Sequence, residues 1–243
     1  MDRAIYQAMA EDEDRHWWFV GRRVVLSGLI QRMAAPGPGA RILDAGCGSG
    51  GNLAMLSAFG AVTGVEFDAE ARGLATERGT AQVLPGALPD GVDLPDASFD
   101  LIGLFDVLEH IERDQASLAT LGEKLTPDGK LVLSVPALPW LWSSHDVAHH
   151  HFRRYTRKGL QSLIADAGLT VDGCGYFNSL LFPAVLVQRL IQKATGMGEA
   201  AARTPPAPLN GVLSGLFGLE RHVIGRVQMP IGLSLWAVAS RTP

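Results

Sequence analysis

Cysteine is scarce in this sequence: among 243 residues there are only two, Cys47 and Cys174. They lie far apart in the chain, and Cys47 falls inside a glycine-rich turn, so no disulfide framework is indicated. The expected compartment is therefore a reducing cytoplasm. The first residues start Met-Asp-Arg and soon become acidic, without the apolar stretch of a secretory signal.

Long hydrophobic runs and basic stripes are also lacking. The most apolar stretch, Leu180 to Leu190, is too short to span a membrane and is interrupted by Pro183, Gln188 and Arg189. The formal net charge is −4 and the basic residues are scattered, so nucleic acid is not an expected partner. No internal repeat is present, and the length suits one α/β domain with extra elements.

The most informative stretch runs from Arg41 to Gly51. An apolar run ends at Asp44, glycines follow at alternate positions, and a helical pattern starts near Asn52. This order predicts a strand, a tight turn and a helix. Glycines let backbone approach a ligand closely, and the N–H groups at a helix start can point at that ligand. The alternative is an ordinary βα turn, in which the glycines are needed only because the turn is tight.

A second signal weighs against that alternative. The segment 62–66 predicts a short strand that ends in an acid, Glu66, roughly 20 residues after the turn. In nucleoside-binding folds, a carboxylate at this place accepts hydrogen bonds from ribose hydroxyls.

The rest of the chain alternates between strand and helix patterns, which predicts a parallel sheet covered on both faces. We expect strands near 41–45, 61–66, 81–84, 98–106, 130–135, 169–176 and 230–240, with helices near 51–59, 68–78, 113–125 and 156–167. The predicted units are a helical lid (1–35), a core (36–176), a helical cap insertion (177–228) and a last strand (229–243).

The order Asp44-x-Gly46-x-Gly48-x-Gly50 resembles the first motif of class I S-adenosylmethionine (SAM) methyltransferases. This order differs from the G-x-G-x-x-G loop of nicotinamide reductases. The carboxylate of Asp44 at the turn would attract the ammonium group of SAM and would repel the phosphates of a nicotinamide cofactor. The segments Phe99-Asp-x-Ile and Leu-x-Pro-Asp-Gly resemble later motifs of the same family, so the resemblance covers about residues 40–136. It implies an α/β fold with a Rossmann-like, seven-stranded, mostly parallel sheet.

The resemblance also implies where SAM binds. The family holds the adenine just past the third strand, which corresponds here to 86–88, with a backbone N–H and apolar packing; Asp90 and Asp93 are weaker acidic candidates. Before the core, His16-Trp-Trp-Phe-x-x-Arg-Arg looks like the leader of a bacterial subgroup, and predicts a lid in which Arg22 or Arg23 faces the donor carboxylate. Simple burial of this helix is the alternative. The predicted donor-binding residues are Trp18, Arg22, Asp44, Gly46, Gly48, Glu66, Phe67, Ala87, Leu88, Phe105 and Asp106.

Residues 137–158 leave the fifth strand beside this site and are dense in aromatic, histidine and arginine side chains. Such a loop at a ligand-binding edge indicates substrate recognition, with a solvated basic loop as the alternative. We expect His145, which has Asp146 beside it, to act as the base, with His150 as its substitute and Asp106 close to the reacting atoms. The predicted acceptor-binding residues are His110, Trp140, Trp142, Arg154 and Tyr155.

A metal-assisted mechanism is the second possibility, because Asp106-x-x-Glu109-His110 supplies two carboxylates and an imidazole at one strand end. It resembles the Glu-x-x-Glu-His site, completed by a later histidine, of ubiquinone-pathway O-methyltransferases and small-RNA 2′-O-methyltransferases. Asp106 is one carbon shorter than the glutamate of those enzymes. Asp-x-x-Glu-His also occurs in methyltransferases that use no metal.

The predicted function is methyl transfer from SAM to a small molecule, at an oxygen of an aromatic or lipid-like compound. The insertion can line an apolar pocket, form a homodimer interface in a chain that is otherwise a monomer, or touch a membrane surface through 180–228. A nicotinamide reductase and a non-catalytic SAM-binding module on a membrane surface are the competing functions.

Overall fold

The computed structural model describes residues 10, 12–187 and 204–242. Seven strands form one sheet in the order β3-β2-β1-β4-β5-β7-β6, and β7 is antiparallel to both of its neighbours. The predicted fold class is confirmed. The strands are β1 (Arg41–Ala45), β2 (Ala61–Glu66), β3 (Gln82–Pro85), β4 (Phe99–Phe105), β5 (Leu125–Pro136), β6 (Leu169–Phe177) and β7 (Ser234–Arg241).

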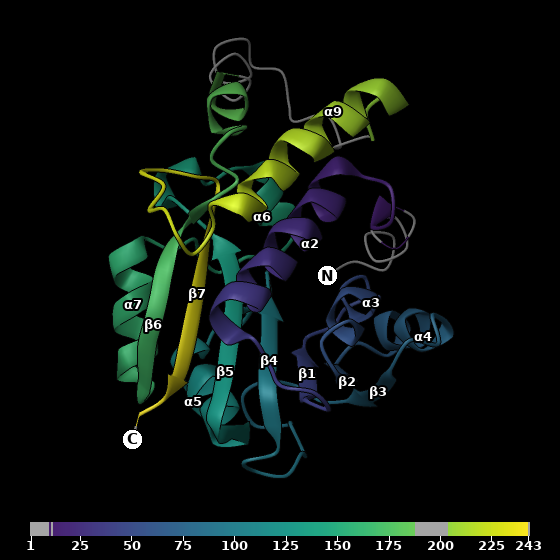
Figure 1. Cartoon of the computed structure of the whole chain (residues 1–243), viewed down its shortest axis with the longest axis vertical. Helices are drawn as coiled ribbons and strands as arrows, with labels where there is room; N and C mark the ends of the chain where they lie inside the picture. The colour runs from purple at the N-terminus through teal and green to yellow at the C-terminus, as the bar shows by residue number, and fades with distance from the viewer. Residues whose placement is uncertain (1–9, 11, 188–203, 243) are drawn as a thin grey trace.

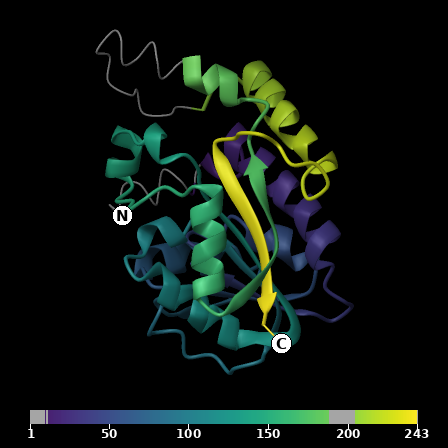
Figure 2. The same cartoon turned by 90° about the vertical axis from the view of Figure 1, so that its left-hand side faces the viewer.

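Helices cover both faces of this sheet. Figure 1 shows α2 crossing the front of the strands, and Figure 2 shows α7 on the opposite side. The α-helices are α2 (Trp17–Leu29), α3 (Leu53–Ser57), α4 (Ala69–Glu77), α5 (Asp114–Lys124), α6 (Ser144–Ala148), α7 (Arg157–Asp166) and α9 (Ala207–Gly218). Shorter turns are a π-helical turn (Ile30–Ala34) and the 3₁₀ turns η2 (Leu108–His110), η3 (Pro139–Leu141) and η4 (Leu219–His222).

The helix starts follow local chemistry. The Asp68 carboxylate accepts hydrogen bonds from the N–H groups of Glu70 and Ala71, and so caps α4. Thr156 caps α7 in the same way. The helix predicted over 51–59 is shorter than expected and spans Leu53–Ser57. In the turn that follows it, Gly60 lies so close to the Ala40 carbonyl that a Cβ there would be 2.2 Å from its oxygen.

The N-terminal helix is predicted to be a lid across the edge of the sheet where the ligand binds. The helix α2 covers more of the sheet than this edge. Its buried residues Val25, Leu26 and Leu29 pack in one core cluster with strand residues such as Leu101 and Trp236. The helix therefore lies along a face of the sheet, and burial of an apolar stripe stabilises it there. Only its N-terminal turns reach the edge where the carboxyl ends of the strands meet.

The insertion before the last strand packs on α2 through α9 (Figure 1). A Cβ at Gly21 of α2 would lie 2.6 Å from the Phe217 ring, so glycine is needed for this close approach. The Asn210 side chain accepts from the Trp17 N–H at 2.8 Å and donates to the Arg15 carbonyl at 2.7 Å. The cap and the N-terminal helix thus form one packed unit.

Phe217→Ala should lower the free energy of unfolding by about 3–5 kcal/mol, because Phe217 is fully buried between α2 and the sheet. Denaturant unfolding followed by circular dichroism measures this change. Leu209→Ala on the same helix, where the side chain is 52% exposed, is the matched control with an expected change within about 0.5 kcal/mol. Equal losses in the two variants would contradict this packing.

A buried carboxylate fastens the insertion to the end of β6. Glu220 accepts hydrogen bonds from the backbone N–H groups of Asn178, Ser179 and Leu180 at 2.7, 2.6 and 2.8 Å. These bonds lower the pKa of Glu220, but burial outweighs them and the pKa is raised.

Within the described part of the chain, no helix has the length and apolarity needed to cross a membrane. Surface contact through 180–228 stays a prediction, and residues 188–203 of that segment lie outside the described structure. The outward side of α9 carries exposed aliphatic side chains at helical spacing, namely Leu209, Val212, Leu216 and Leu219, the last just past its end.

Candidate active site

Three acidic residues follow or end neighbouring parallel strands at one edge of the sheet. Asp44 lies in β1, Glu66 ends β2 and Asp106 follows β4. β1 lies between β2 and β4, so the chain order reverses at β1. Open α/β sheets bind ligands outside the carboxyl ends of their strands at such a switch point.

Asp44 is the most deeply buried of the three, with 1% of its surface exposed. Burial raises its pKa to about 7, and the negative charges of Glu13 and Glu66 add to this effect, while Arg22 opposes it. Its Oδ2 atom accepts no hydrogen bond from any described residue. A buried acceptor without a donor suits a ligand that brings its own N–H groups, such as an ammonium.

The glycine turn has the shape of a cradle. Gly46 and Gly48 have φ angles of +75° and +55°, which disfavour other residues. A Cβ at Gly48 would meet nothing within 4 Å, so the space beside it is open to a ligand. The backbone N–H groups of Gly50 and Leu53, however, bond to carbonyls within the turn. This turn therefore lets a ligand come close to the backbone, whereas these N–H groups at the helix start are already used within the turn.

Glu66 is held rigidly beside the turn. Its Oε2 accepts from the Gly48 N–H and its Oε1 from the Asp68 N–H, both at 2.9 Å. Burial raises the pKa of Glu66, although these N–H groups work in the opposite direction. Each carboxylate oxygen keeps a lone pair for a hydroxyl donor. The ring of Phe67 follows directly and is 65% exposed at the same edge.

Glu66→Ala should weaken SAM binding roughly tenfold to hundredfold if this buried carboxylate makes the predicted contact with the ribose hydroxyls. Isothermal titration calorimetry with SAM measures the change. Glu123→Ala, at an exposed position of α5, is the control. An unchanged dissociation constant for Glu66→Ala would show that the ribose contact lies elsewhere.

The loop after β3 forms its own hydrogen bonds. Residues 86–88 are predicted to hold the adenine through a backbone N–H and apolar packing. The Gly86 N–H donates to the Glu66 carbonyl at 3.3 Å and the Ala87 N–H to the Gly91 carbonyl at 3.2 Å. Leu88 is partly buried against the main core cluster, and the adenine contact stays a prediction. Asp90 forms an ion pair with Arg113 at an exposed position.

Arg22 lies at the predicted place and is nearly buried, but it has a protein partner. It forms an ion pair with Asp106 and stacks over the Trp18 ring, 4.6 Å from the centroid. Asp106 has a φ of +55° and also accepts from the Ser134 hydroxyl at 3.0 Å. Arg23 lies outside this network and donates to the Glu13 carbonyl. Of the two arginines in the leader, Arg22 is the one that contacts Asp106 at the carboxyl ends of the strands.

On the acceptor side, Asp146 is the centre of the loop that follows β5. It is fully buried and accepts from the Ser143 N–H at 2.9 Å, from Arg154 Nε at 2.8 Å and from His151 Nδ1 at 2.9 Å. Burial raises the pKa of Asp146, but the hydrogen bonds from His151 and Arg154 outweigh this and hold the pKa below its usual range. Asp146 therefore stays ionised and orients the His151 ring.

His151 lies against the residues that follow β4. The rings of His151 and His110 meet edge to face with centroids 4.6 Å apart. Ligand atoms of Glu109, His110 and His151 all lie within 4.8 Å of one another. Burial, together with His151 and His149, lowers the pKa of His110 to about 3, so its ring is neutral.

Glu109 is the third member of this group and is only 1% exposed. Burial raises its pKa well above the usual range, and the charge of Asp106 adds to the effect. Its Oε2 has no partner among the described residues. Asp106, predicted as a ligand beside Glu109 and His110, pairs with Arg22 instead, and His151 takes its place in the group.

The structure distributes the other predicted loop residues differently. His150 is exposed, and the side chain of His145 lies outside the described part. Tyr155 is buried, and its hydroxyl donates to Asp114 at 3.1 Å, so it anchors the loop and does not face an acceptor. The rings of Trp140 and Trp142 are 61% and 42% exposed.

His151 is the functional candidate that sequence reasoning missed. The fold turns the chain so that this histidine, five positions after Asp146, reaches its carboxylate. A role for His145 as the base stays a prediction. The run of three histidines at 149–151 was the available signal.

Comparisons with known proteins agree with this geometry. Residues 19–172, more than half of the chain, match a family model described as a methyltransferase domain. Over 226 residues the chain is 28% identical to trans-aconitate 2-methyltransferase of Deinococcus radiodurans, across 91% of this chain and 82% of that protein. It is 38% identical over 104 residues to the mitochondrial ubiquinone biosynthesis O-methyltransferase of Schizosaccharomyces pombe, across 40% of this chain and 38% of that protein's length.

Solved structures show the same fold. A structure of the Haloferax volcanii Trm112 methyltransferase activator with a methyltransferase matches with a TM-score of 0.65 at 19% identity, covering 99% of this chain and 95% of that chain. The geranyl diphosphate C-methyltransferase of Streptomyces coelicolor, solved with Mg²⁺, geranyl diphosphate and S-adenosylhomocysteine, matches with 0.61 at 14% identity, covering 89% and 80%.

Proposed function

This chain belongs to the methyltransferase-domain family of SAM-dependent class I enzymes, and from that premise we propose that it methylates an oxygen atom of a small aromatic or lipid-like molecule. The named relatives include O- and C-methyltransferases. The choice of oxygen therefore depends on the residues of this chain at the acceptor side.

One observation carries the proposal: the His151–Asp146 pair at the carboxyl end of β4. Because Asp146 is ionised and accepts from Nδ1, the ring is oriented with Nε2 directed away from this carboxylate, and Nε2 is the atom to which we assign the uptake of the acceptor proton. A hydroxyl acceptor must lose a proton, and an oriented imidazole supplies a base of suitable strength near neutral pH.

The residues of the site suit the reaction. When bound, SAM supplies a methyl group on a positively charged sulfur, and the carbon–sulfur bond breaks with its electrons moving to sulfur as the acceptor oxygen bonds to carbon. Asp44 and Glu66 hold the two polar ends of the donor, and holding the reactants in line accounts for much of the rate. His151 Nε2 takes the hydroxyl proton, while the exposed Trp140 and Trp142 offer apolar surface to the acceptor.

An acceptor screen tests the proposal. The purified protein is incubated with methyl-labelled SAM and matched aromatic acceptors that carry a hydroxyl, a carboxylate, an amine or only an activated carbon. Label on the hydroxyl oxygen is the expected result. Transfer to nitrogen or carbon alone would contradict an oxygen acceptor, and failure to bind SAM would remove the basis for any transfer.

A metal-assisted O-methyltransferase is the second candidate function, favoured by the group Glu109, His110 and His151. An orphaned buried carboxylate oxygen beside two imidazoles is a donor set that fits a divalent cation. Such an ion would lower the pKa of the acceptor hydroxyl, and these three residues would hold it. Elemental analysis of the purified protein, with Glu109→Gln as the comparison, decides between the two mechanisms.

A further inference from the structure

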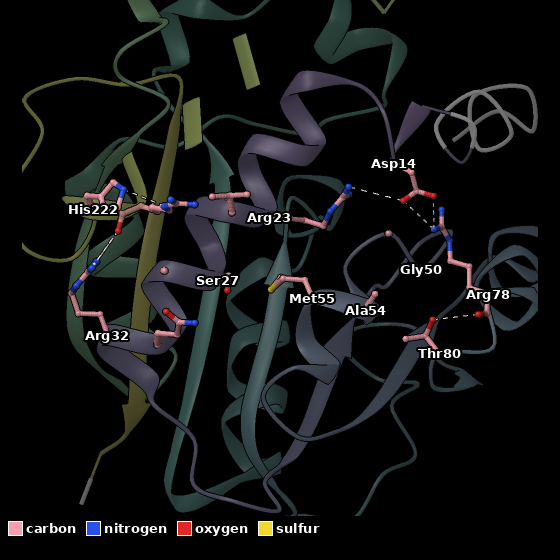
Figure 3. Close-up of a pocket in the computed structure, with 15 residues that line it drawn as sticks. Asp14, Arg23, Ser27, Arg32, Gly50, Ala54, Met55, Arg78, Thr80 and His222 are labelled. Carbon is pink, nitrogen blue, oxygen red and sulfur yellow. Dashed lines mark hydrogen bonds and ion pairs between the residues drawn. The ribbon is translucent and has the colours of Figure 1, made fainter. Parts of the chain in front are cut away.

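A concave basin of about 840 Å³ lies outside the donor and acceptor sites (Figure 3). Its floor is the side of α2 opposite the stripe that packs on the sheet, and it includes the small residues Ser27 and Gly28. One wall is η4, and the other is formed by the glycine turn, α3 and the residues after α4. The volume is in the range of small-molecule pockets.

Positive charge is concentrated at both ends of this basin. Arg23 and Arg78 lie toward one end and Arg32 toward the other (Figure 3). Arg221 also lines the basin, and its carbonyl accepts a hydrogen bond from Arg32. Among the described residues that line it, Asp14 alone is acidic. The chain as a whole has a net charge of −4, so this local cluster of positive charge is opposite in sign to the net charge of the protein.

The two ends differ in how far their charge is neutralised. Arg78 forms ion pairs with Glu13 at 2.9 Å and with Asp14 at 3.2 Å. These contacts compensate the end beside the glycine turn, and Arg78 serves there to fasten the segment before α2.

At the other end, the guanidinium groups bond only to uncharged partners. Arg32 donates to the backbone carbonyls of Arg221 and Ile224, and Arg221 Nε donates to His222 Nε2 at 3.2 Å. Within the described chain, no carboxylate pairs with Arg32 or Arg221. Two cations therefore face the same basin with their charge uncompensated.

We propose that the basin binds a small polyanion that carries phosphate groups, held mainly by Arg32 and Arg221. The guanidinium fork matches phosphate oxygens in a bidentate geometry. Arg23 of α2 and Arg32 of the π-helical turn that follows it line opposite ends of the basin, which suits an anion with several linked phosphates or of nucleotide size. This site does not depend on the methyl-transfer proposal, and its backbone link to the donor site is the turn at Gly50 and Gly51.

Calorimetric titration of the full chain with sodium tripolyphosphate tests the proposal. Saturable binding is expected, and Arg221→Ala should raise the dissociation constant at least about tenfold, as expected for loss of a charge-assisted hydrogen bond. Arg221→Lys, which keeps the charge but not the fork, should fall between. Arg41→Ala, at an exposed position of β1 outside the basin, should bind like the unchanged protein.

Three results would overturn the proposal. They are absence of saturable binding at millimolar tripolyphosphate, equal affinities of the Arg221→Ala and Arg41→Ala variants, and displacement of tripolyphosphate by SAM, which would place the anion in the donor site. The proposal would also be overturned if a short single-stranded RNA bound more tightly than tripolyphosphate and lost this affinity in Arg221→Ala. The ligand of the basin would then be a nucleic acid and not a small molecule. Thermal melts of each variant confirm that it is folded.

Discussion

His151→Ala is expected to lower kcat by about 10²–10⁴-fold while leaving the affinity for SAM within about twofold, because a positioned general base contributes that much to proton transfer. His151 is oriented by a buried, ionised Asp146 and lies against His110, which follows β4. Single-turnover kinetics with the best acceptor from the screen measures the change, and calorimetry with SAM confirms that the donor site is intact.

His150→Ala is the comparison variant for this experiment. His150 is the adjacent residue, but it is exposed and belongs to no described hydrogen bond with Asp146. A large loss of kcat in His150→Ala, with little change in His151→Ala, would assign the base to His150. A third variant, Asp146→Asn, should also lower kcat, since an amide can no longer fix the His151 tautomer.

SAM affinity should rise steeply with pH up to about 7 and then level off. Asp44 has its pKa raised to about 7 by burial, with Glu13 and Glu66 adding and Arg22 opposing. Below that pH Asp44 is protonated, and binding the donor ammonium requires it to lose the proton, so affinity falls by up to about tenfold per pH unit. Near pH 8 the α-amino group of SAM starts to lose its own charge, which sets the upper limit.

Calorimetry at pH 5.5, 6.5 and 7.5 measures this dependence, and Asp44→Asn isolates its source. That variant should bind SAM more weakly at pH 7.5 and show little change with pH. Asp128→Asn, at an exposed position of β5, should keep the full pH dependence. A pH profile that persists in Asp44→Asn would place the titrating group elsewhere.

The raised pKa also has a consequence for folding. Asp44 ionises near pH 3.8 in an unfolded chain and near 7 in the folded protein. The unliganded protein therefore loses stability as the pH rises through this window, because the folded state holds the proton more tightly. A donor that pairs with the carboxylate relieves this cost, so the rise in melting temperature on adding SAM should be larger at pH 7.5 than at pH 6.

The fold class, the family and the place of the predicted donor site could be read from local patterns in the sequence. Strand ends in parallel sheets meet at one edge, so an acid at the end of each predicted strand, Asp44, Glu66 and Asp106, had to gather there with the glycine turn. The family, the sheet and the cofactor followed from residues that are close in the chain. Local periodicity also predicted α4 and α7, whose caps are short-range interactions.

The contacts of the loop after β5 and the basin beside α2 could not be read from the sequence and became visible in the folded protein. Which histidine meets Asp146 depends on the path of an irregular loop, whose hydrogen bonds have no periodic pattern to read. The same holds for Arg22, which pairs with Asp106 across 84 positions of the chain, and for Arg32 and Arg221, brought together by packing of the insertion on α2. Such long-range contacts form because a folded chain must bury its apolar surface and must give each buried charged group a partner. The partner can come from any part of the chain, so a single segment of sequence does not reveal it.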